Sequence, residues 1–180
     1  MIVLAVTAAT LLFAPMTATT LLALFIFLGH FALGFADDYI KVVKKRNLGL
    51  RAYQKLLGQC AIALVTIIIG QQVLGHDTKV WLPLAGGTFD LGILYYLLIV
   101  FVLVGTSNAV NLTDGLDGLA AGTVAAAAVF YAVLLCGTDN GLMVFSVAIL
   151  GACIGFLWYN HHPARIFMGD TGSLALGGAL

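Results

Sequence analysis

The sequence predicts an all-α protein, a polytopic transmembrane helical bundle. Of its 180 residues, 62% are hydrophobic and only 9% are charged, whereas about a quarter of the residues in an ordinary soluble domain are charged. The mean hydropathy of +1.08 agrees, and several apolar runs approach the roughly 20 residues that a helix needs to cross the hydrocarbon core. A formal net charge of zero also argues against a nucleic-acid-binding protein, which needs a basic surface.

Seven apolar runs predict the helices in order. Pro15 and the threonines that follow it mark a turn between the first two runs. The runs cover residues 2–13, 20–36, 56–74, 91–104, 119–136, 142–159 and the end of the chain from about residue 171. About five of them are long enough for a full span, and the first and last are incomplete spans. We therefore expect residues 1–180 to be a single transmembrane domain that is truncated at both ends.

The charged residues divide unequally between the two sides of the membrane. Seven of the eight Lys and Arg residues lie in the connectors 37–55, 106–117 and 160–170, and only Lys79 lies in a connector of the opposite side. Because cytoplasmic loops carry the excess of Lys and Arg, the first set faces the cytoplasm. This assignment also places five aspartates on the cytoplasmic face: Asp37, Asp38, Asp114, Asp117 and Asp170.

The connector 75–90 on the outer side predicts a short β-hairpin. Val80, Trp81 and Leu82 form a short apolar run, and the turn residues Pro83, Gly86 and Gly87 follow it. We expect Trp81 to anchor the hairpin at the membrane interface.

The five cytoplasmic aspartates predict a metal site. Carboxylates that converge on one face repel one another unless a cation lies among them, and magnesium prefers short carboxylates together with substrate phosphates. Asp114, Asp117 and Asp170 each precede a predicted helix, so their alternative role is that of an N-cap. Asp37 and Asp38 follow a span, where the helix dipole disfavours a negative charge.

A run of cations lies beside these carboxylates. Topology and anionic lipid headgroups are the alternative explanation for such a run. We favour Lys41 and Lys55 as functional residues because each borders a span close to the carboxylates. Carboxylates, a hard cation and lysines at a membrane surface predict a site that handles phosphate groups. The full run contains Lys41, Lys44, Lys45, Arg46, Arg51 and Lys55.

Three motifs are more specific than this composition. Residues 37–41 read DDYIK, a DDxxK pattern at the end of a span, residues 108–119 read NAVNLTDGLDGL, and residues 167–173 read FMGDTGS. In this order they resemble the motifs of the polyprenyl-phosphate N-acetylhexosamine 1-phosphate transferases. Within that family, NLTDGLDGLA, FLWYN and GDTGSLALGG resemble the phospho-N-acetylmuramoyl-pentapeptide transferases. The resemblance extends over residues 15–180.

This resemblance implies a catalytic domain and a reaction. Phospho-N-acetylmuramoyl-pentapeptide would be transferred from UDP to undecaprenyl phosphate with release of UMP, the first membrane step of peptidoglycan synthesis. The implied cofactor is Mg²⁺, and the implied location is the bacterial inner membrane, with the active site on the cytoplasmic face. The implied partners are UDP-N-acetylmuramoyl-pentapeptide, undecaprenyl phosphate and the lipid bilayer, without nucleic acid. The family tends to pair, which implies a homodimer.

The resemblance also implies roles for individual residues. Asp170 matches a magnesium ligand, Asp37 and Asp38 match aspartates that position or deprotonate the lipid phosphate, and Asp114 is the third catalytic candidate. Of direct attack and a covalent aspartyl intermediate, we favour direct attack, because a carboxylate nucleophile that approaches a diphosphate meets added repulsion. The substrate-binding candidates are Lys41, Lys55, Asn111, Leu116, Asp117, Asn160 and Phe167, the last stacked on the uracil.

Two segments of the family have no counterpart in these residues, an upstream cytoplasmic segment rich in Thr and Gly and a downstream loop with a His-rich motif. We therefore expect the 180 residues alone to be inactive or nearly so. His161 and His162 are interpreted as polar interfacial residues, with phosphate contact as the alternative. His30, inside an apolar span, is interpreted as an interhelical hydrogen-bonding residue.

The sequence leaves other functions open. A sister transferase that uses UDP-N-acetylglucosamine shares the DDxxK and DGxDG patterns. An ion-coupled transporter is a more distant alternative, because transporter carboxylates usually lie near the bilayer midplane on broken helices, whereas all eight aspartates here lie in connectors or at span ends. A purely structural membrane subunit would not need five carboxylates on one face.

Overall fold

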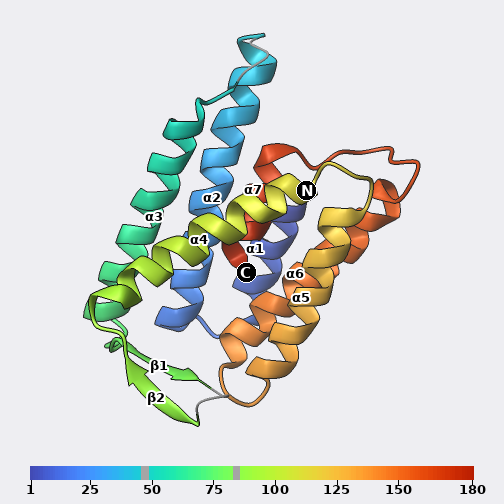
Figure 1. The fold of residues 1–180 in the computed structure, drawn as a ribbon. Helices are drawn as coiled ribbons and strands as arrows, with labels where there is room; N and C mark the ends of the chain where they lie inside the picture. The colour runs from blue at the N-terminus through green and yellow to red at the C-terminus, as the bar shows by residue number, and fades with distance from the viewer. Residues whose placement is uncertain (46–48, 83–85) are drawn as a thin grey trace.

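The computed structural model describes residues 1–45, 49–82 and 86–180 (Figure 1). Within these residues the chain forms seven helices and one two-stranded antiparallel sheet. The helices are α1 (Ile2–Phe13), α2 (Ala18–Val43), α3 (Ala52–Gln72), α4 (Ile93–Thr113), α5 (Leu119–Leu135), α6 (Asn140–Asn160) and α7 (Gly169–Ala179). Strands β1 (Lys79–Leu82) and β2 (Gly87–Asp90) lie between α3 and α4. The prediction of an all-α, polytopic membrane protein is confirmed.

Four helices in the described part of the chain, α2, α3, α4 and α6, are long and apolar enough to cross a membrane. α5 is also apolar but has only 17 residues, which is at the lower limit of about 17 residues for a span. α1 has 12 residues and α7 has 11. These lengths fit the expected division into longer spans and two shorter helices at the ends.

Two helices extend beyond the apolar runs that predicted them. α2 continues to Val43, so the DDxxK motif lies on its last turns and not in the following connector. An ion pair between Lys41 and Asp37, one turn apart, supports this extension. α4 continues to Thr113, which places Asn108 and Asn111 on a helix. The predicted ends of both helices were therefore wrong, because charged and polar residues that pair with one another do not interrupt a helix.

α7 lies in the centre of the bundle, where it packs against α2 and α4 (Figure 1). Seven consecutive residues of α7, 172–178, are buried. Small residues allow this close packing: a Cβ atom at Gly34 of α2 would overlap the backbone carbonyl of Asp170, and one at Gly177 would lie 2.6 Å from the Cα atom of Ser107. The start of α7 is consequently held against both neighbouring helices.

His30 lies in this interface, fully buried. A Cβ atom at Gly178 of α7 would lie 2.5 Å from its ring. Its Nδ1 atom lies 2.9 Å from the carbonyl oxygen of Ile26, on the same helix, and its Nε2 atom has no hydrogen-bond partner among the described residues. The expected interhelical hydrogen bond is therefore wrong, and the ring packs against a glycine of the neighbouring helix instead.

The predicted hairpin is confirmed. Lys79 pairs with Asp90 and Leu82 pairs with Gly87 in antiparallel register. The hairpin lies at the end of the bundle opposite to the end of α2 (Figure 1). Trp81 is 64% exposed there, as an interfacial anchor would be, and Pro83 lies outside the described residues.

Candidate active site

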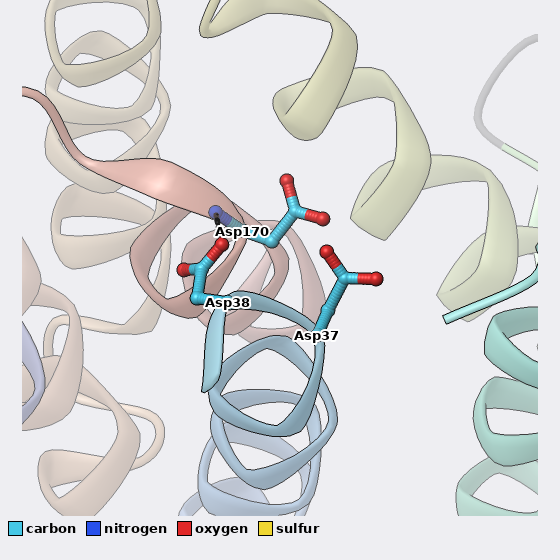
Figure 2. A group of neighbouring side chains, drawn as sticks. All are labelled: Asp37, Asp38 and Asp170. Atoms are coloured by element: carbon cyan, nitrogen blue, oxygen red, sulfur yellow. Dashed lines mark hydrogen bonds between the residues drawn. The ribbon is translucent and has the colours of Figure 1, made fainter. Parts of the chain in front are cut away.

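Three carboxylates from two helices meet where α2 ends and α7 begins (Figure 2). One oxygen atom from each of Asp37, Asp38 and Asp170 lies within 4.8 Å of the others. Asp37 is fully buried, and the side chains of Asp38 and Asp170 are 27% and 15% exposed. The first and third sequence motifs, far apart along the chain, therefore share one site.

Asp38 caps the start of α7. Its Oδ2 atom accepts hydrogen bonds from the backbone N–H of Thr171 at 2.8 Å and from the Thr171 hydroxyl at 2.5 Å. Gly169 has a positive φ of 66°, and a Cβ atom there would lie 2.8 Å from Asp38 Oδ2. A carboxylate at this position satisfies free N–H groups and interacts favourably with the helix dipole. One helix thus fixes the position of the next.

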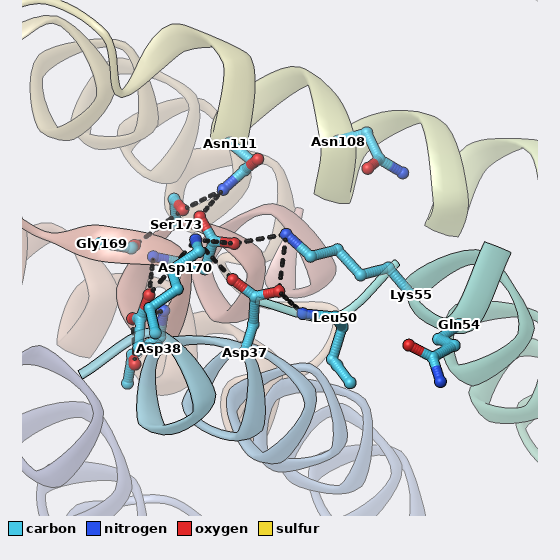
Figure 3. Close-up of polar contacts among 12 residues, drawn as sticks. Asp37, Asp38, Leu50, Gln54, Lys55, Asn108, Asn111, Gly169, Asp170 and Ser173 are labelled. Carbon is cyan, nitrogen blue, oxygen red and sulfur yellow. Dashed lines mark hydrogen bonds and ion pairs between the residues drawn. The ribbon is translucent and has the colours of Figure 1, made fainter. Parts of the chain in front are cut away.

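Asp170, one residue into α7, collects contacts from three other helices (Figure 3). Its Oδ2 atom lies 2.5 Å from Lys55 Nζ and 3.1 Å from Lys41 Nζ. Asn111 Nδ2 donates to Asp170 Oδ1 at 2.9 Å and to Ser173 Oγ at 2.8 Å. Burial raises the pKa of Asp170, but hydrogen bonds, including those from Lys55, Asn111 and Lys41, outweigh it and hold this pKa well below its ordinary value.

Asp37 is held equally firmly. It accepts a hydrogen bond from the backbone N–H of Leu50 at 2.7 Å, and Lys55 Nζ lies 3.2 Å from the same oxygen atom. Its second oxygen atom, Oδ2, forms an ion pair with Lys41 Nζ at 2.5 Å. A Cβ atom at Gly49 would lie 2.5 Å from this carboxylate, so only glycine fits beside it.

These charges do not balance. Three aspartates and two lysines sum to one excess negative charge, in a cluster whose carboxylates supply oxygen ligands. Oxygen ligands and a surplus of negative charge suit a hard divalent cation. The cluster can therefore hold a metal ion.

Asp114 lies beside this cluster as the C-terminal cap residue of α4. Burial, reinforced by the negative charge of Asp170, raises its pKa to about 6. Its alternative role as an N-cap is wrong, because α5 begins after Gly118 without a side-chain cap. Asp114 and Asn111 therefore both come from the end of α4 and lie next to Asp170.

The remaining predicted residues form a separate group around the segment that leads into α7. Asn160 is 4% exposed; its Oδ1 atom accepts a hydrogen bond from the backbone N–H of Gly118 at 3.0 Å, and its Nδ2 atom donates to the carbonyl of Ile166 at 2.8 Å. Leu116 and Phe167 are 69% and 74% exposed. Asn160 thus ties together the segments that present these two exposed side chains.

Asp117 belongs to this second group. It accepts hydrogen bonds from the backbone N–H of Ala164 at 3.0 Å and from His162 Nδ1 at 3.1 Å. The bond from Ala164 is the main reason that the pKa of Asp117 lies below its ordinary value. Asp117 therefore does not cap α5, and His162 contacts it at the surface.

Among the described members of the predicted cation run, Lys41 and Lys55 form ion pairs with the carboxylates of the site. Arg46 lies outside the described residues.

Sequence reasoning missed several polar residues that hold the site together. The Ser173 hydroxyl donates to the carbonyl of Gly169 at 2.8 Å, and Thr171 bonds to Asp38. Both could have been found, because they lie within the third motif on the first turn of a helix. The Leu50 backbone N–H could not, since any residue except proline supplies one.

This arrangement defines a class of membrane protein, a bundle of apolar helices with an aspartate-rich site at one end. Residues 3–180 match Glycosyl transferase family 4, and the chain belongs to this family.

Curated proteins similar to this chain share one name. The chain is 53% identical over 169 residues to a protein of Heliobacterium modesticaldum and 55% identical over 170 residues to one of Anoxybacillus flavithermus. It is 52% identical over 169 residues to a protein of Bacillus subtilis. Each is named phospho-N-acetylmuramoyl-pentapeptide-transferase, and the matches cover 93%, 94% and 93% of this chain but 52% of each relative. The chain thus spans about half the length of the curated relatives it matches.

Proposed function

We propose that this chain carries the active site of an enzyme that transfers phospho-N-acetylmuramoyl-pentapeptide from UDP to undecaprenyl phosphate and releases UMP. The observation that carries this proposal is the meeting of Asp37, Asp38 and Asp170 with Lys41 and Lys55. Phosphoryl transfer needs positioned groups that neutralise the charge on the reacting phosphates. A site with both carboxylates and ammonium groups meets this need. Relatives that bear the name of this activity support the choice of substrates.

We propose Mg²⁺ as the metal. Asp170, with Asp37 and Asp38 beside it, would hold the ion. The donors fit because all three are carboxylates, one oxygen atom of each lies within 4.8 Å of the others, and their charge exceeds that of the two lysines by one. When bound, the ion supplies neutralisation of the negative charge on the diphosphate. Asn111 donates to Asp170 Oδ1 and thereby fixes the orientation of this carboxylate.

The two lysines have a dual role in this proposal. In the absence of substrate they neutralise Asp37 and Asp170, and in its presence their ammonium groups face the phosphate oxygens. Asp37 then holds or takes the proton of the lipid phosphate. An oxygen atom of the lipid phosphate attacks the phosphorus that bears the sugar, the new P–O bond forms a diphosphate, and the bond to UMP breaks. Asp114, whose pKa is raised to about 6, lies close to Asp170, where the proposal places the metal ion and the diphosphate.

The second group of residues forms the nucleoside side of the proposed site. Phe167 is 74% exposed and has a free ring face on which the uracil can stack. Leu116 and Asp117 lie beside the segment that Asn160 ties to α5 and α6. The proposal places this side, with the carboxylate cluster, on the cytoplasmic face of the bacterial inner membrane. The excess of Lys and Arg in the same connectors supports this orientation. The proposal also includes the pairing of two copies of the protein as a homodimer.

The test uses membranes that contain the full-length product of the gene that encodes this chain. They are incubated with undecaprenyl phosphate and either radiolabelled UDP-N-acetylmuramoyl-pentapeptide or radiolabelled UDP-N-acetylglucosamine. We expect Mg²⁺-dependent transfer of label to the lipid with the first substrate only. Transfer from the second substrate alone would contradict the proposed sugar.

The variant Asp170→Asn tests whether Asp170 holds the metal ion. This variant keeps the hydrogen bond with Asn111 sterically possible but removes the charge that would hold the metal ion. We expect its activity to fall by about two orders of magnitude or more, as for the loss of a main electrostatic contribution, with partial recovery at raised Mg²⁺. Full activity of Asp170→Asn would exclude Asp170 as a metal ligand.

A further inference from the structure

One helical turn below the carboxylate site lies a second group of polar side chains, which the proposed chemistry does not use. Gln59 of α3 is 1% exposed, and Ser107 of α4 is fully buried. Gln59 Nε2 donates to Ser107 Oγ at 3.0 Å, and Gln59 Oε1 accepts a hydrogen bond from Asn108 Nδ2 at 2.9 Å. Both ends of the buried amide of Gln59 are therefore bonded to the neighbouring helix.

The residues of this second group lie on the same helices as residues of the active site, four positions away from them in the sequence. Four residues make about one turn, or about 6 Å along a helix. On each helix, one residue contacts Asp170 or Asn111. The residue one turn away belongs to the second group on α3 and α4 and packs against this group on α7. The three pairs are Lys55 and Gln59 on α3, Asn111 and Ser107 on α4, and Ser173 and Gly177 on α7.

The packing of α7 connects the carboxylate site with the second group of polar side chains. A Cβ atom at Gly177 would lie 2.6 Å from the Cα atom of Ser107, so α7 touches the backbone of α4 at the point where Gln59 is bound. Figure 3 shows Asn108 and Asn111 projecting from the same side of α4. Movement of α3 along or around α4 at the level of Gln59 would consequently displace Lys55 from Asp170.

Stability alone does not explain this amide. A polar side chain inside an apolar bundle must be desolvated, and its interhelical hydrogen bonds give only modest stabilisation. A well-packed apolar residue would hold the two helices together equally well, but it would not select one register. A hydrogen-bonded amide does select a register, because both of its ends need partners at fixed positions.

We propose that Gln59 is a positioning residue. It fixes α3 against α4 so that Lys55, one turn away, reaches Oδ2 of Asp170. The part of this inference that concerns turnover rests on the proposed function, whereas the part that concerns the geometry of Lys55 does not.

The geometric part is tested by the chemical reactivity of Lys55. The full-length protein is treated with formaldehyde and a borohydride, and methylation of each lysine is followed by mass spectrometry. We expect Lys55 to be methylated several-fold faster in Gln59→Leu than in the parent, because its amine loses the shielding of Asp37 and Asp170. Lys79, whose side chain is 58% exposed in the hairpin, is the internal reference and should not change.

Thr66→Val is the matched control variant. Thr66 also lies on α3, but its hydroxyl donates to the carbonyl of Ile62 on the same helix, so its loss should leave Lys55 reactivity at the parent value. Ser107→Ala, which removes one of the two interhelical bonds of Gln59, should raise the reactivity of Lys55 by a smaller factor than Gln59→Leu does. This second variant also decides the question if Gln59→Leu fails to fold. Unchanged reactivity of Lys55 in the folded variants would overturn the inference.

The catalytic part is tested by a double-mutant cycle with Lys55→Met. If Gln59 acts through Lys55, Gln59→Leu lowers kcat in the parent but has no further effect when Lys55 is already absent. Independent losses of kcat that multiply would instead indicate a general structural role and would overturn the inference. If the parent itself transfers no label, the proposed function fails, and the reactivity of Lys55 still decides whether Gln59 positions it.

Discussion

At the residue scale, the site combines three aspartates with two lysines that offset all but one of their negative charges. Asp170 is held in its ionised form by Lys55, Asn111 and Lys41, whereas Asp114 close by has a raised pKa. Carboxylates with pKa values pushed in opposite directions within one site are typical of functional clusters. Two predictions concern single side chains of this site.

Asp114→Asn should stabilise the protein at neutral pH in the presence of a chelator. Because the pKa of Asp114 is raised to about 6 in the fold, its protonated form favours folding. That contribution is present in full below the unfolded pKa and is lost as the pH rises through 6. Asparagine mimics the protonated form, and solvent screening limits the gain to about 1 kcal/mol. Thermal unfolding at about pH 7.5 and about pH 4.5 measures it. A gain that is larger at the lower pH would contradict the prediction.

Phe167→Ala should weaken binding of the UDP substrate by about 1–3 kcal/mol, the usual contribution of one base stacked on an aromatic ring. Because Phe167 is 74% exposed, little folding stability should be lost. Substrate affinity is measured by calorimetry, with the unchanged melting temperature as the control. A variant that raised only the KM for the lipid substrate would show that Phe167 does not stack on the nucleotide.

At the scale of elements, the start of α7 is fixed by α2 in two ways. Asp38 caps its N–H groups, and Gly34 lets its backbone approach. The sequence predicted that the two stretches would lie on one side of the membrane, because loop charges indicate the side of each connector. It did not predict the cap, since the residue that caps α7 lies on another helix and no local pattern contains both partners.

Gly34→Leu should disrupt the site without touching any charged group. A side chain at this position would overlap the backbone of Asp170, so α7 must move away from α2, at a cost of about 1–3 kcal/mol or more for overpacking. We expect a lower melting temperature and the loss of Mg²⁺ binding together. Gly105→Leu on α4 is the control, because a Cβ atom there meets nothing within 4 Å. Normal Mg²⁺ binding by Gly34→Leu would show that the contact is dispensable.

At the scale of the whole molecule, three distant motifs meet because α2, α4 and α7 carry them to the same end of one bundle (Figure 1). Hydrophobic runs predicted each helix, but not how far α2 and α4 extend beyond those runs. The hydrophobic runs also did not predict which helices pack against one another. α7 occupies the centre because its glycine and alanine residues allow close contact, a property that depends on its neighbours.

Mg²⁺ should raise the melting temperature of the whole protein, since a ligand that binds only the folded state stabilises it. At about 100 times its Kd the expected stabilisation is about 2.7 kcal/mol. The measurement is a thermal shift against Mg²⁺ concentration, with Asp170→Asn as the variant that should not respond. An equal shift in that variant would place the ion elsewhere.

The lysine ammonium groups at 2.5 Å from Asp37 and Asp170 have one more consequence. They act as internal counterions, so a divalent cation that bound at the proposed site would have to displace them. Each displaced ammonium group would then be free to attract an anionic ligand. Binding of the cation and binding of a phosphorylated molecule would thereby be thermodynamically linked, and each would raise the affinity for the other by the same factor.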